Sequence, residues 1–578
     1  EGNLKMKRAV SILLVLYMAV GLTACGQKTQ EEAVQTPADT AELAEVVKSI
    51  DGKFENPITV KVGLGEQETY QGNESSTDNA WIDLYKDYGI NLDIMYVVPG
   101  TESNDKLSQM IMSGNYPDVF NVSLEDYVDY VKQGVVADIT DYYDDYLSDA
   151  AKDYLAYDGG DSVKRATVDG RIYGIPQMAS STDQVSVLWI RKDWLNNLGL
   201  EVPETAEEVA EIAKEFTFHD PDGNGQDDTY GFAINGMDIT DACGGVAHVM
   251  NMFGTMPRQL RFVEENGEII WAGQDEEKMV SGLTWLSDLY AQGCVPKDFV
   301  TSDANKLRAD FASGKYGMVI APMWWMMDYL ADALKYDPNA DFAALPIPSS
   351  EVNPDGAVYF PSATISFWVL SSKCEHPEAL FKLFNMSVDY IVNNKDRTTE
   401  QYEKYAAGKA GMYTGKSLAV IPYLDDPADN YNNYLQESKA ISTGNTDELT
   451  PMQKTHYESE TFFLENKENL AELSGEDWSK FGIGASYYSV FGFDEAGYGA
   501  LHKMVEADKW KKEAFLSMPD QEMLSANANL AAMTSEAIVK IVMGQQEPES
   551  YGEFLEQWKA KGGETILKKV NEWYQENK

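Results

Sequence analysis

The sequence predicts an α/β fold built around a largely parallel sheet. Apolar stretches with the period of a strand alternate with helical stretches from residue 58 onward, and the same alternation begins again near residue 185. The chain has 578 residues, which is enough for two or more hydrophobic cores. Hydrophobic residues make up 44% of it and aromatic residues 11%, so the composition is that of a globular protein.

The first series of elements begins near Asn56. ITVKVGL (58–64) alternates apolar and polar side chains, as expected for a strand. Further strands are predicted at 90–98 and 117–122, and the intervening helices are predicted within 78–89, 102–114 and 124–134. Because ligands of such sheets bind at the carboxyl ends of the strands, the loops that follow these strands are candidate binding segments.

The second series starts with an apolar strand at 185–190. A helix follows Thr205, and Glu208 stands three positions later, which is the spacing of a capping box. After this helix comes an acidic loop, and then YGFAI (230–234), which is predicted to be a strand.

The N-terminal residues have the pattern of a secretory signal. Lys5, Lys7 and Arg8 precede an apolar run at 9–21, and small residues follow it. The run is shorter than the roughly 20 apolar residues that a spanning helix needs. Residues 1–25 are therefore interpreted as a signal peptide, and no later segment has a long apolar run.

LTAC (22–25) resembles the bacterial lipobox, in which the cysteine becomes the first mature residue and carries the lipid. The resemblance implies a lipid anchor (palmitate) at Cys25, so that the protein is held to a membrane without a spanning helix. An ordinary signal with an incidental cysteine is the alternative. The polar segment 26–55 is interpreted as a flexible tether.

Charge and cysteine content exclude several classes of protein. The formal net charge of -48 argues against nucleic acid or an anionic membrane surface as the binding partner. Cys243, Cys294 and Cys374 match no metal-binding spacing and are interpreted as buried free thiols. The five histidines are scattered, with no HExxH motif, which argues against a zinc enzyme.

Several segments, in this order, resemble the extracellular solute-binding proteins of ABC importers, in the cluster that takes up sugars and oligosaccharides. They are YGIPQM (173–178), VLWIRKDWLNNLGLEVPETAEEVAEIA (187–213), FASGKYGMVIAPMWW (311–325), ALPIPSS (344–350), FWVLSSKCEHPEALFKLFN (367–385) and the C-terminal stretch 541–574. The region from about 396 to 477 contains no matching motif.

The resemblance implies a two-lobed, periplasmic-binding-protein-like (type II) fold with hinge crossovers. Applied to this chain, lobe 1 comprises 56–182 and roughly 365–480, and lobe 2 comprises 183–364 and roughly 481–578. Crossings are expected near 178–186 and 361–367, with a third in the unmatched region. The resemblance also implies a monomeric, non-catalytic protein that is lipid-anchored on the extracellular face of a bacterial membrane. Its partners would be an oligosaccharide and an ABC transporter permease.

HDPDGNGQDDTYG (219–231) places oxygen-bearing residues at the spacing of a calcium loop. Positions 1, 3, 5, 7 and 9 are Asp220, Asp222, Asn224, Gln226 (through its carbonyl) and Asp228, with glycine at position 6. Gly231 replaces the bidentate glutamate of an EF-hand at position 12, so the loop is not an EF-hand. A similar loop holds a structural Ca²⁺ in many members of the family that the chain resembles. The alternative is a solvated turn rich in Asp, Asn and Gly.

Candidate ligand contacts are aromatic and polar residues in segments expected at the cleft. The resemblance puts Trp324 at the position of a sugar platform, and Trp325 is its neighbour; the other candidates are Gln67, Asp183, Trp368 and Tyr487. Tyr487 lies in GIGASYYSVFG, whose Gly and Ser predict an exposed loop. For each of these residues a place in the core or on an ordinary surface is the alternative.

Three functions are compatible with the sequence. The first is capture of a neutral oligosaccharide and its delivery to an ABC importer by closure of the lobes. The second is a secreted glycoside hydrolase, which needs two carboxylates at a defined separation. The third is binding of peptides or of acidic sugars, for which cations should line the cleft. Only Arg171, Arg191 and Lys192 lie near the expected hinge, which favours a neutral sugar.

Overall fold

The computed structural model describes residues 37–66, 75–393, 400–407, 414–422, 424 and 426–578. The chain divides into two compact units, Glu1–Ala44 and Glu45–Lys578, with the boundary inside helix α1 (Pro37–Lys48). All elements discussed below belong to the second unit. Among the described residues, none of the helices combines the length and the apolar character needed to cross a membrane.

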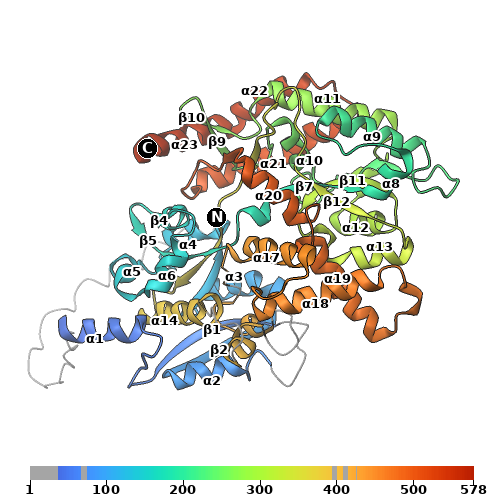
Figure 1. The fold of residues 1–578 in the computed structure, drawn as a ribbon. Helices are drawn as coiled ribbons and strands as arrows, with labels where there is room; N and C mark the ends of the chain where they lie inside the picture. The colour runs from blue at the N-terminus through green and yellow to red at the C-terminus, as the bar shows by residue number, and fades with distance from the viewer. Residues whose placement is uncertain (1–36, 67–74, 394–399, 408–413, 423, 425) are drawn as a thin grey trace, which may run out of the picture. The chain divides into compact units, whose positions relative to one another are not determined.

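A five-stranded sheet forms the centre of lobe 1 (Figure 1). Its strands, in spatial order, are β2 (Ile90–Pro99), β1 (Ile58–Glu66), β3 (Val119–Ser123), β14 (Thr364–Leu370) and β6 (Gly174–Met178). β1 pairs in parallel with β2 and β3, whereas β14 is antiparallel to both β3 and β6. The predicted strands at 58–64, 90–98 and 117–122 are therefore confirmed, and the sheet is mixed.

Helices flank this sheet because the strands bury apolar side chains that need cover. β1 buries Ile58, Val60 and Val62 while the residues between them are exposed, which is the period of two that the sequence shows. The flanking helices are α2 (Ala80–Asp87), α3 (Ser103–Ser113), α4 (Leu124–Lys132), α5 (Thr140–Tyr146), α6 (Asp149–Leu155), α7 (Asp161–Arg165) and α14 (Glu378–Ser387).

A four-stranded sheet forms the centre of lobe 2. Its order is β12 (Phe342–Leu345), β7 (Ser186–Arg191), β11 (Tyr316–Pro322) and β8 (Tyr230–Phe232). Every residue of β7 and β11 is buried, as expected for central strands covered on both faces. The surrounding helices are α8 (Lys192–Leu198), α9 (Ala206–Phe218), α10 (Val246–Val249), α11 (Glu276–Gln292), α12 (Ala304–Ala312) and α13 (Leu330–Tyr336). The capping box at the start of α9 is confirmed, with both Thr205 and Glu208 bonded as predicted.

The chain passes between the two sheets more than once. β6 belongs to the first sheet and β7 to the second, so residues 179–185 form the first crossing, where the sequence predicts it. β12 belongs to the second sheet and β14 to the first, and between them β13 (Val358–Phe360) pairs in parallel with β15 (Trp510–Lys512). The other strands of the described residues form two hairpins. One pairs β4 (Thr167–Val168) with β5 (Arg171–Ile172), and the other pairs β9 (Phe262–Glu265) with β10 (Glu268–Trp271).

The region without sequence motifs is largely helical. Its helices are α15 (Glu400–Tyr402), α16 (Thr414–Ser417), α17 (Asp429–Thr443), α18 (Pro451–Asn466) and the first residues of α19 (Gly475–Phe491). α18 packs on α19, and α19 in turn contacts α13 and the turn η5 (Trp325–Asp328), so this helical segment is connected to the elements around the second sheet. The lobe boundaries drawn from the sequence stay a prediction.

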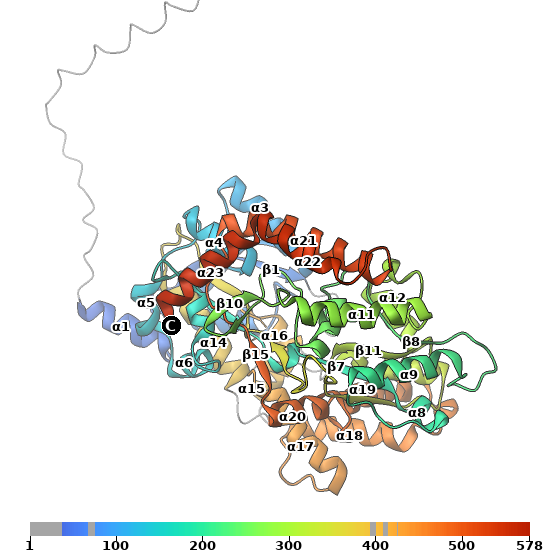
Figure 2. The same cartoon turned by 90° about the horizontal axis from the view of Figure 1, so that it is seen from above.

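Four helices form the C-terminal part of the chain. They are α20 (Gly497–Ala507), α21 (Gln521–Val542), α22 (Ser550–Trp558) and α23 (Glu564–Asn577). α20 contacts β12 and β7, and α21 packs on α11, so both contact lobe 2. α21 also contacts α4 of lobe 1, and Figure 2 shows these two helices near each other.

Candidate ligand-binding site

A cavity of about 310 Å³ lies at the carboxyl ends of β1 and β3. Gly63 to Gly65 of β1 and Phe120 and Asn121 of β3 line it, together with Tyr96, Gln177, Trp368 and residues 417–422. The ligand position that the sheet type predicts therefore coincides with an actual cavity. None of the described residues that line it carries a charge.

Gly63 shapes this cavity because it leaves room for an aromatic ring. A Cβ atom at this position would lie 2.1 Å from Cζ of Tyr96, so only glycine allows the phenol to lie over β1. Burial raises the pKa of Tyr96, which keeps its hydroxyl in the neutral form. The ring thus adds a flat apolar surface with a hydrogen-bonding end.

A network of amides holds Trp368 at the cavity wall. Gln177 Oε1 accepts hydrogen bonds from Trp368 Nε1 at 3.0 Å and from Ser366 Oγ at 3.3 Å. Asn121 Nδ2 donates to Ser366 Oγ at 2.9 Å, and these four residues come from three adjacent strands, β3, β14 and β6. Trp368 is 7% exposed, so its indole is fixed and mostly packed. Aromatic faces beside fixed amides suit a ligand with apolar faces and hydroxyl rims.

The two other predicted tryptophans lie elsewhere, in the turn after β11. Trp324 is half-buried, and the guanidinium of Arg308 lies 5.7 Å from the centre of its ring. Trp325 is 1% exposed, with Arg308 at 5.2 Å and Tyr329 at 6.1 Å. Trp324 and Trp325 are adjacent residues in a turn, not in an extended strand. Trp325 is a core residue, whereas Trp324 keeps part of its surface exposed.

Asp183 lies in the first crossing and joins it to two later helices. Its Oδ1 accepts a hydrogen bond from the hydroxyl of Tyr498, and its Oδ2 accepts one from Asn430 Nδ2 at 2.8 Å. Burial raises the pKa of this carboxyl group, and these hydrogen bonds act in the opposite direction. These hydrogen bonds connect the first crossing to α17 and α20; a role of Asp183 in ligand contact stays a prediction.

The predicted exposed loop around Tyr487 is wrong, because these residues form helix α19. The glycines that suggested a loop serve close packing: a Cβ at Gly484 would lie 2.0 Å from the carbonyl oxygen of Ser459 on α18. Tyr487 stacks on His456, with ring centres 3.8 Å apart. Gln67 lies outside the described residues, as does Cys25.

The predicted calcium loop connects α9 to β8. Asn224 Nδ2 donates to Asp222 Oδ2 at 2.9 Å and to Asp228 Oδ1 at 3.2 Å, and Asp220 Oδ2 accepts the N–H of Gly225 at 3.0 Å. Desolvation raises the pKa of Asp222, and the neighbouring carboxylates add to this shift. Asp220 Oδ1 is buried and has no hydrogen-bond partner among the described residues. Two carboxylates therefore converge on the side-chain amide of Asn224, and a third accepts the backbone N–H of the next residue, Gly225.

The cations that the sequence placed near the hinge are all neutralised by carboxylates. Arg171 pairs with Asp138 at 2.5 Å and with Asp141 at 3.1 Å, and it is exposed. Arg191 is buried and pairs with Asp193 and Asp337, both at 2.6 Å. Lys192 pairs with Glu495. None of these side chains is available as a ligand-binding cation.

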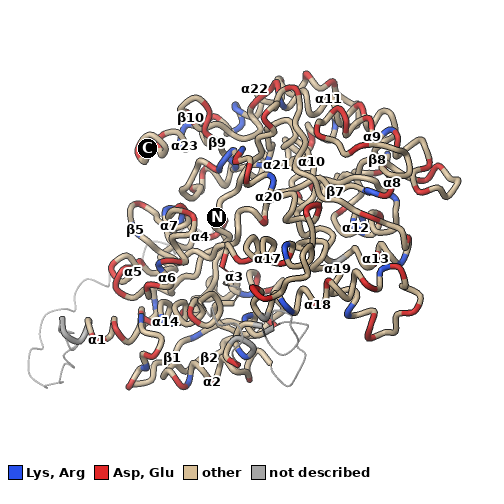
Figure 3. The backbone as a smooth tube through the Cα atoms, in the orientation of Figure 1, with Lys and Arg blue, Asp and Glu red and all other residues tan. Residues whose placement is uncertain are grey.

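Sequence reasoning missed a different group of cations. Arg165 ends α7, and Arg258 and Arg261 stand in the loop before β9. Figure 3 shows Lys and Arg segments gathered beside β9, whereas acidic segments are spread over most of the chain. No spacing or period links residues 165 and 258, so only the fold brings them together. Asn121, Gln177 and Tyr96 were also missed, although their position at strand ends could have suggested them.

A family model for bacterial extracellular solute-binding proteins matches residues 71–389, which is more than half of the chain. The chain belongs to this family. It is therefore an extracellular solute-binding protein and not an enzyme, and the two-lobed α/β fold expected from the sequence is confirmed.

Curated relatives and solved structures agree with this assignment. Lipoprotein LipO of Bacillus subtilis (strain 168) is 25% identical over 492 residues, which cover 83% of this chain and 86% of the relative. The polygalacturonan/rhamnogalacturonan-binding protein YtcQ of the same organism is 28% identical over 317 residues, covering 54% and 57%. The S. pneumoniae ABC-transporter substrate-binding protein FusA, solved with kestose, superposes with a TM-score of 0.58 at 17% identity, covering 90% of this chain and all of that one.

Proposed function

We propose that this protein captures an oligosaccharide outside the cell and delivers it to the permease of an ABC importer. The observation that carries the proposal is the uncharged cavity at the carboxyl ends of β1 and β3, with Trp368 and the amides of Gln177 and Asn121 in its wall. Indole and phenol faces bind the C–H faces of sugars, and fixed amides bind their hydroxyls. The names of YtcQ and FusA, which specify a polysaccharide and an ABC transporter, support the same class of ligand.

Calorimetric titration of the mature protein with a panel of oligosaccharides tests this proposal. A saturating heat with one ligand, and no shortening of that ligand on prolonged incubation, is the expected result. Shortened chains would instead identify a hydrolase, and the absence of binding across neutral and acidic oligosaccharides would contradict the proposal.

Anchoring of the protein through a lipid on Cys25 belongs to the same proposal, because an importer is served by a binding protein held near its permease. Its support is the basic start, the apolar run and the LTAC sequence. Cells that express the chain with radiolabelled palmitate are expected to yield a labelled, membrane-bound protein. The Cys25→Ala variant is expected to lose both the label and the membrane fraction; retention of the label would show that Cys25 is not the modified residue.

We also propose that the loop at 220–228 holds a structural Ca²⁺. Asp220, Asp222 and Asp228 supply carboxylates, the buried Oδ1 of Asp220 lacks a partner, and Asn224 would turn its amide oxygen inward in place of its NH₂. In the described part of the chain, no three His, Cys, Asp or Glu side chains are arranged to hold a metal ion, so the proposal depends on the loop closing around the ion when it binds. Chelation is therefore expected to lower the melting temperature more than it weakens sugar binding. An unchanged melting temperature would refute the assignment.

A further inference from the structure

Arg165, Arg258 and Arg261 form a group of closely placed cations that we call the arginine cluster. Arg165 is 6% exposed; its Nη2 donates to the carbonyl of Phe515 at 2.9 Å, and its Nε has no hydrogen-bond partner among the described residues. The three guanidinium groups lie within electrostatic range, since Arg261 lowers the pKa of both Arg165 and Arg258, although desolvation is the larger cause in each case. The cluster thus joins a helix of lobe 1 to a loop of lobe 2.

The loop that carries Arg258 and Arg261 is held rigidly by its backbone. The carbonyl of Arg258 accepts the indole N–H of Trp271 at 2.8 Å, and the carbonyl of Arg261 accepts the N–H of Ala272 at 2.9 Å. Trp271 itself stacks on Trp558, with ring centres 4.6 Å apart. The side chains therefore project from a fixed base, as a preorganised recognition site requires.

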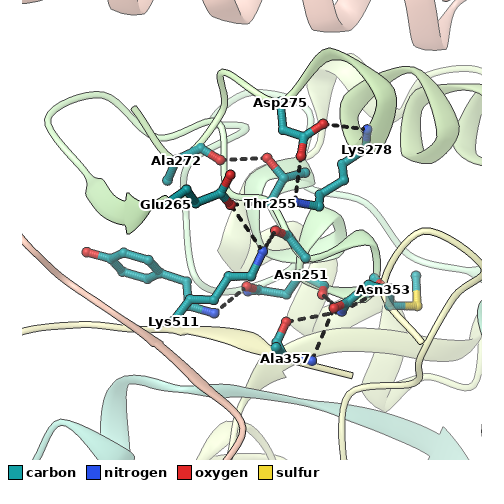
Figure 4. Close-up of polar contacts among 12 residues, drawn as sticks. Asn251, Thr255, Glu265, Ala272, Asp275, Lys278, Asn353, Ala357 and Lys511 are labelled. Atoms are coloured by element: carbon teal, nitrogen blue, oxygen red, sulfur yellow. Dashed lines mark hydrogen bonds and ion pairs between the residues drawn. The ribbon is translucent and has the colours of Figure 1, made fainter. Parts of the chain in front are cut away.

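These arginines lack the partners that neighbouring cations have. At the other end of β9, Lys278 pairs with Asp275 at 2.5 Å, and Lys511 lies 3.8 Å from Glu265 and donates to the carbonyl of Gly254 (Figure 4). Among the described residues, by contrast, neither Arg258 nor Arg261 has a carboxylate oxygen within 4.0 Å or a hydrogen bond from its guanidinium. Partly buried cations without anions are unfavourable unless a ligand supplies the charge.

The nearby ionisable groups do not cancel this positive charge. Glu513 is the buried carboxylate that faces Arg165 and Arg261, but its oxygens accept the hydroxyl of Tyr359 and the N–H of Phe262. Glu125 and Asp238 lie within electrostatic range and are exposed. His248 is neutral, because burial, reinforced by Arg258, lowers its pKa to about 3. One buried carboxylate thus faces two of the three arginines, Arg165 and Arg261.

A cavity of about 190 Å³ lies beside Arg258. Its polar lining consists of Thr240, Gln259, Asn527, Thr534 and Ser535. The side-chain amide of Gln259 already has hydrogen-bond partners within the protein, because it donates to Thr534 Oγ1 at 2.7 Å and accepts from Trp558 Nε1 at 3.2 Å. The amide oxygen Oδ1 of Asn527, in contrast, is buried without a hydrogen-bond partner among the described residues. The cavity therefore offers a ligand one cation, several hydroxyl groups and an amide oxygen without a hydrogen-bond partner.

One carboxylate near the uncharged cavity lies within electrostatic range of the cluster. Glu125, whose charge acts on Arg258 and Arg261, stands in the first turn of α4, directly after β3. Asn121 of β3 lines the uncharged cavity. The end of β3 thus connects the two features, so that one extended ligand could meet both.

We infer that the arginine cluster binds the carboxylate of a uronic acid residue, so that the ligand is an acidic oligosaccharide whose neutral part occupies the cavity beside Trp368. A planar carboxylate accepts paired N–H groups from guanidinium, and the hydroxyls and amide around Arg258 suit the rest of the sugar ring. The inference rests on the proposed function and revises the preference for a neutral sugar that Arg171, Arg191 and Lys192 suggested.

The test compares matched ligands on the mature wild-type protein. Oligogalacturonate, oligomannuronate and glucuronate-substituted xylo-oligosaccharides of three to five residues are titrated by calorimetry, each beside its methyl-esterified counterpart and beside neutral oligosaccharides of equal length. At least one acid is expected to bind about tenfold or more tightly than its own ester, because a hydrogen-bonded charge pair is lost on esterification. Its affinity is also expected to fall as salt is raised, and that of the ester is expected to stay constant.

The variants Arg258→Gln and Arg261→Gln assign the effect to the cluster. Each is expected to weaken binding of the acid by about tenfold or more and to leave binding of the ester unchanged. Arg171→Gln, the same change at an exposed and paired arginine, is the control and is expected to bind like wild type. Thermal melts of each variant confirm that it is folded.

Each other outcome has a definite meaning. If an ester or a neutral oligosaccharide binds as tightly as every acid, the inference is overturned and the proposed function stands. If an acid is preferred but both cluster variants retain the preference, the arginine cluster is the wrong site. If no oligosaccharide of either kind binds, the proposed function itself fails.

Discussion

Glu460 on α18 provides a stability test because it is a buried carboxyl group without a partner. It is 0% exposed, and neither of its oxygens has a hydrogen-bond partner among the described residues. Burial, reinforced by the buried Glu437, raises its pKa from 4.5 to about 9. His456 lies beside Glu437, with 2.9 Å between Nδ1 and Oε1, and burial lowers its pKa to about 4, so it supplies no positive charge at neutral pH. Glu460 is therefore protonated in the folded protein at pH 7.

The sign and size of the effect follow from this raised pKa. Folded protein keeps a proton on Glu460 that unfolded chains release above pH 4.5, so the stabilisation is complete below that pH and is lost as the pH rises toward 9. Between pH 4.5 and pH 7 the loss amounts to about 3 kcal/mol, at about 1.4 kcal/mol for each pH unit. Glutamine has the shape of the protonated acid and cannot ionise. Glu460→Gln is thus expected to raise the free energy of unfolding by about 3 kcal/mol at pH 7 and hardly at all at pH 4.5.

Guanidinium unfolding, followed by tryptophan fluorescence at pH 4.5, 6, 7 and 8.5, measures this difference. Glu458→Gln removes an exposed carboxylate two residues away on the same helix and is the matched control. Its stability is expected to follow that of wild type at every pH. If Glu460→Gln and wild type lose stability in parallel between pH 4.5 and pH 7, Glu460 is ionised in the folded protein and the argument is wrong.

Two further changes test packing and ligand contact. Gly484→Leu should destabilise the protein by about 2–4 kcal/mol, because a Cβ there would meet the backbone of Ser459; Gly475→Leu, where a Cβ meets nothing within 4 Å, is the control for thermal melting. A melting temperature of Gly484→Leu equal to that of wild type would contradict the close packing of α18 on α19. Trp368→Ala should weaken binding of the best oligosaccharide by about tenfold, measured by calorimetry, whereas Trp325→Phe in the core should leave the affinity unchanged. Equal affinities of wild type and Trp368→Ala would show that the indole of Trp368 does not contribute to ligand binding.

Local chemical signals allowed much of the fold to be predicted. The period of two in 58–64 and the capping box of Thr205 and Glu208 depend only on neighbours in sequence, and both are present in the structure. The prediction of a loop around Tyr487 was wrong for a physical reason. Glycine lowers helix propensity, but at position 484 it permits a helix contact that any larger residue would block, and tertiary packing outweighs the local preference.

The candidate site could be predicted only in part. The sequence offers Trp368 as a candidate only because it begins an apolar strand, and the same pattern fits a core residue. Its place at the cavity follows from the pairing of β14 with β3 and β6. The arginine cluster has no sequence signal at all. Residues 165 and 258 belong to different lobes, and neither stands in a motif, so their proximity is a property of the assembled fold.

The absence of carboxylate partners around Arg258 and Arg261 carries weight because of the composition. The chain has 94 Asp and Glu for 46 Lys and Arg, and Arg171, Arg191 and Lys192 each lie against a carboxylate. Other described cations without a carboxylate partner, such as Arg308, Lys373 and Lys382, donate to a hydroxyl or to backbone carbonyls instead, whereas the guanidinium groups of Arg258 and Arg261 donate no hydrogen bond among the described residues. The excess of negative charge also repels an acidic glycan at long range, an effect that salt screens within about 10 Å. A protein that binds such a ligand therefore needs its cations concentrated at one point and without carboxylate partners, which is the arrangement of Arg165, Arg258 and Arg261.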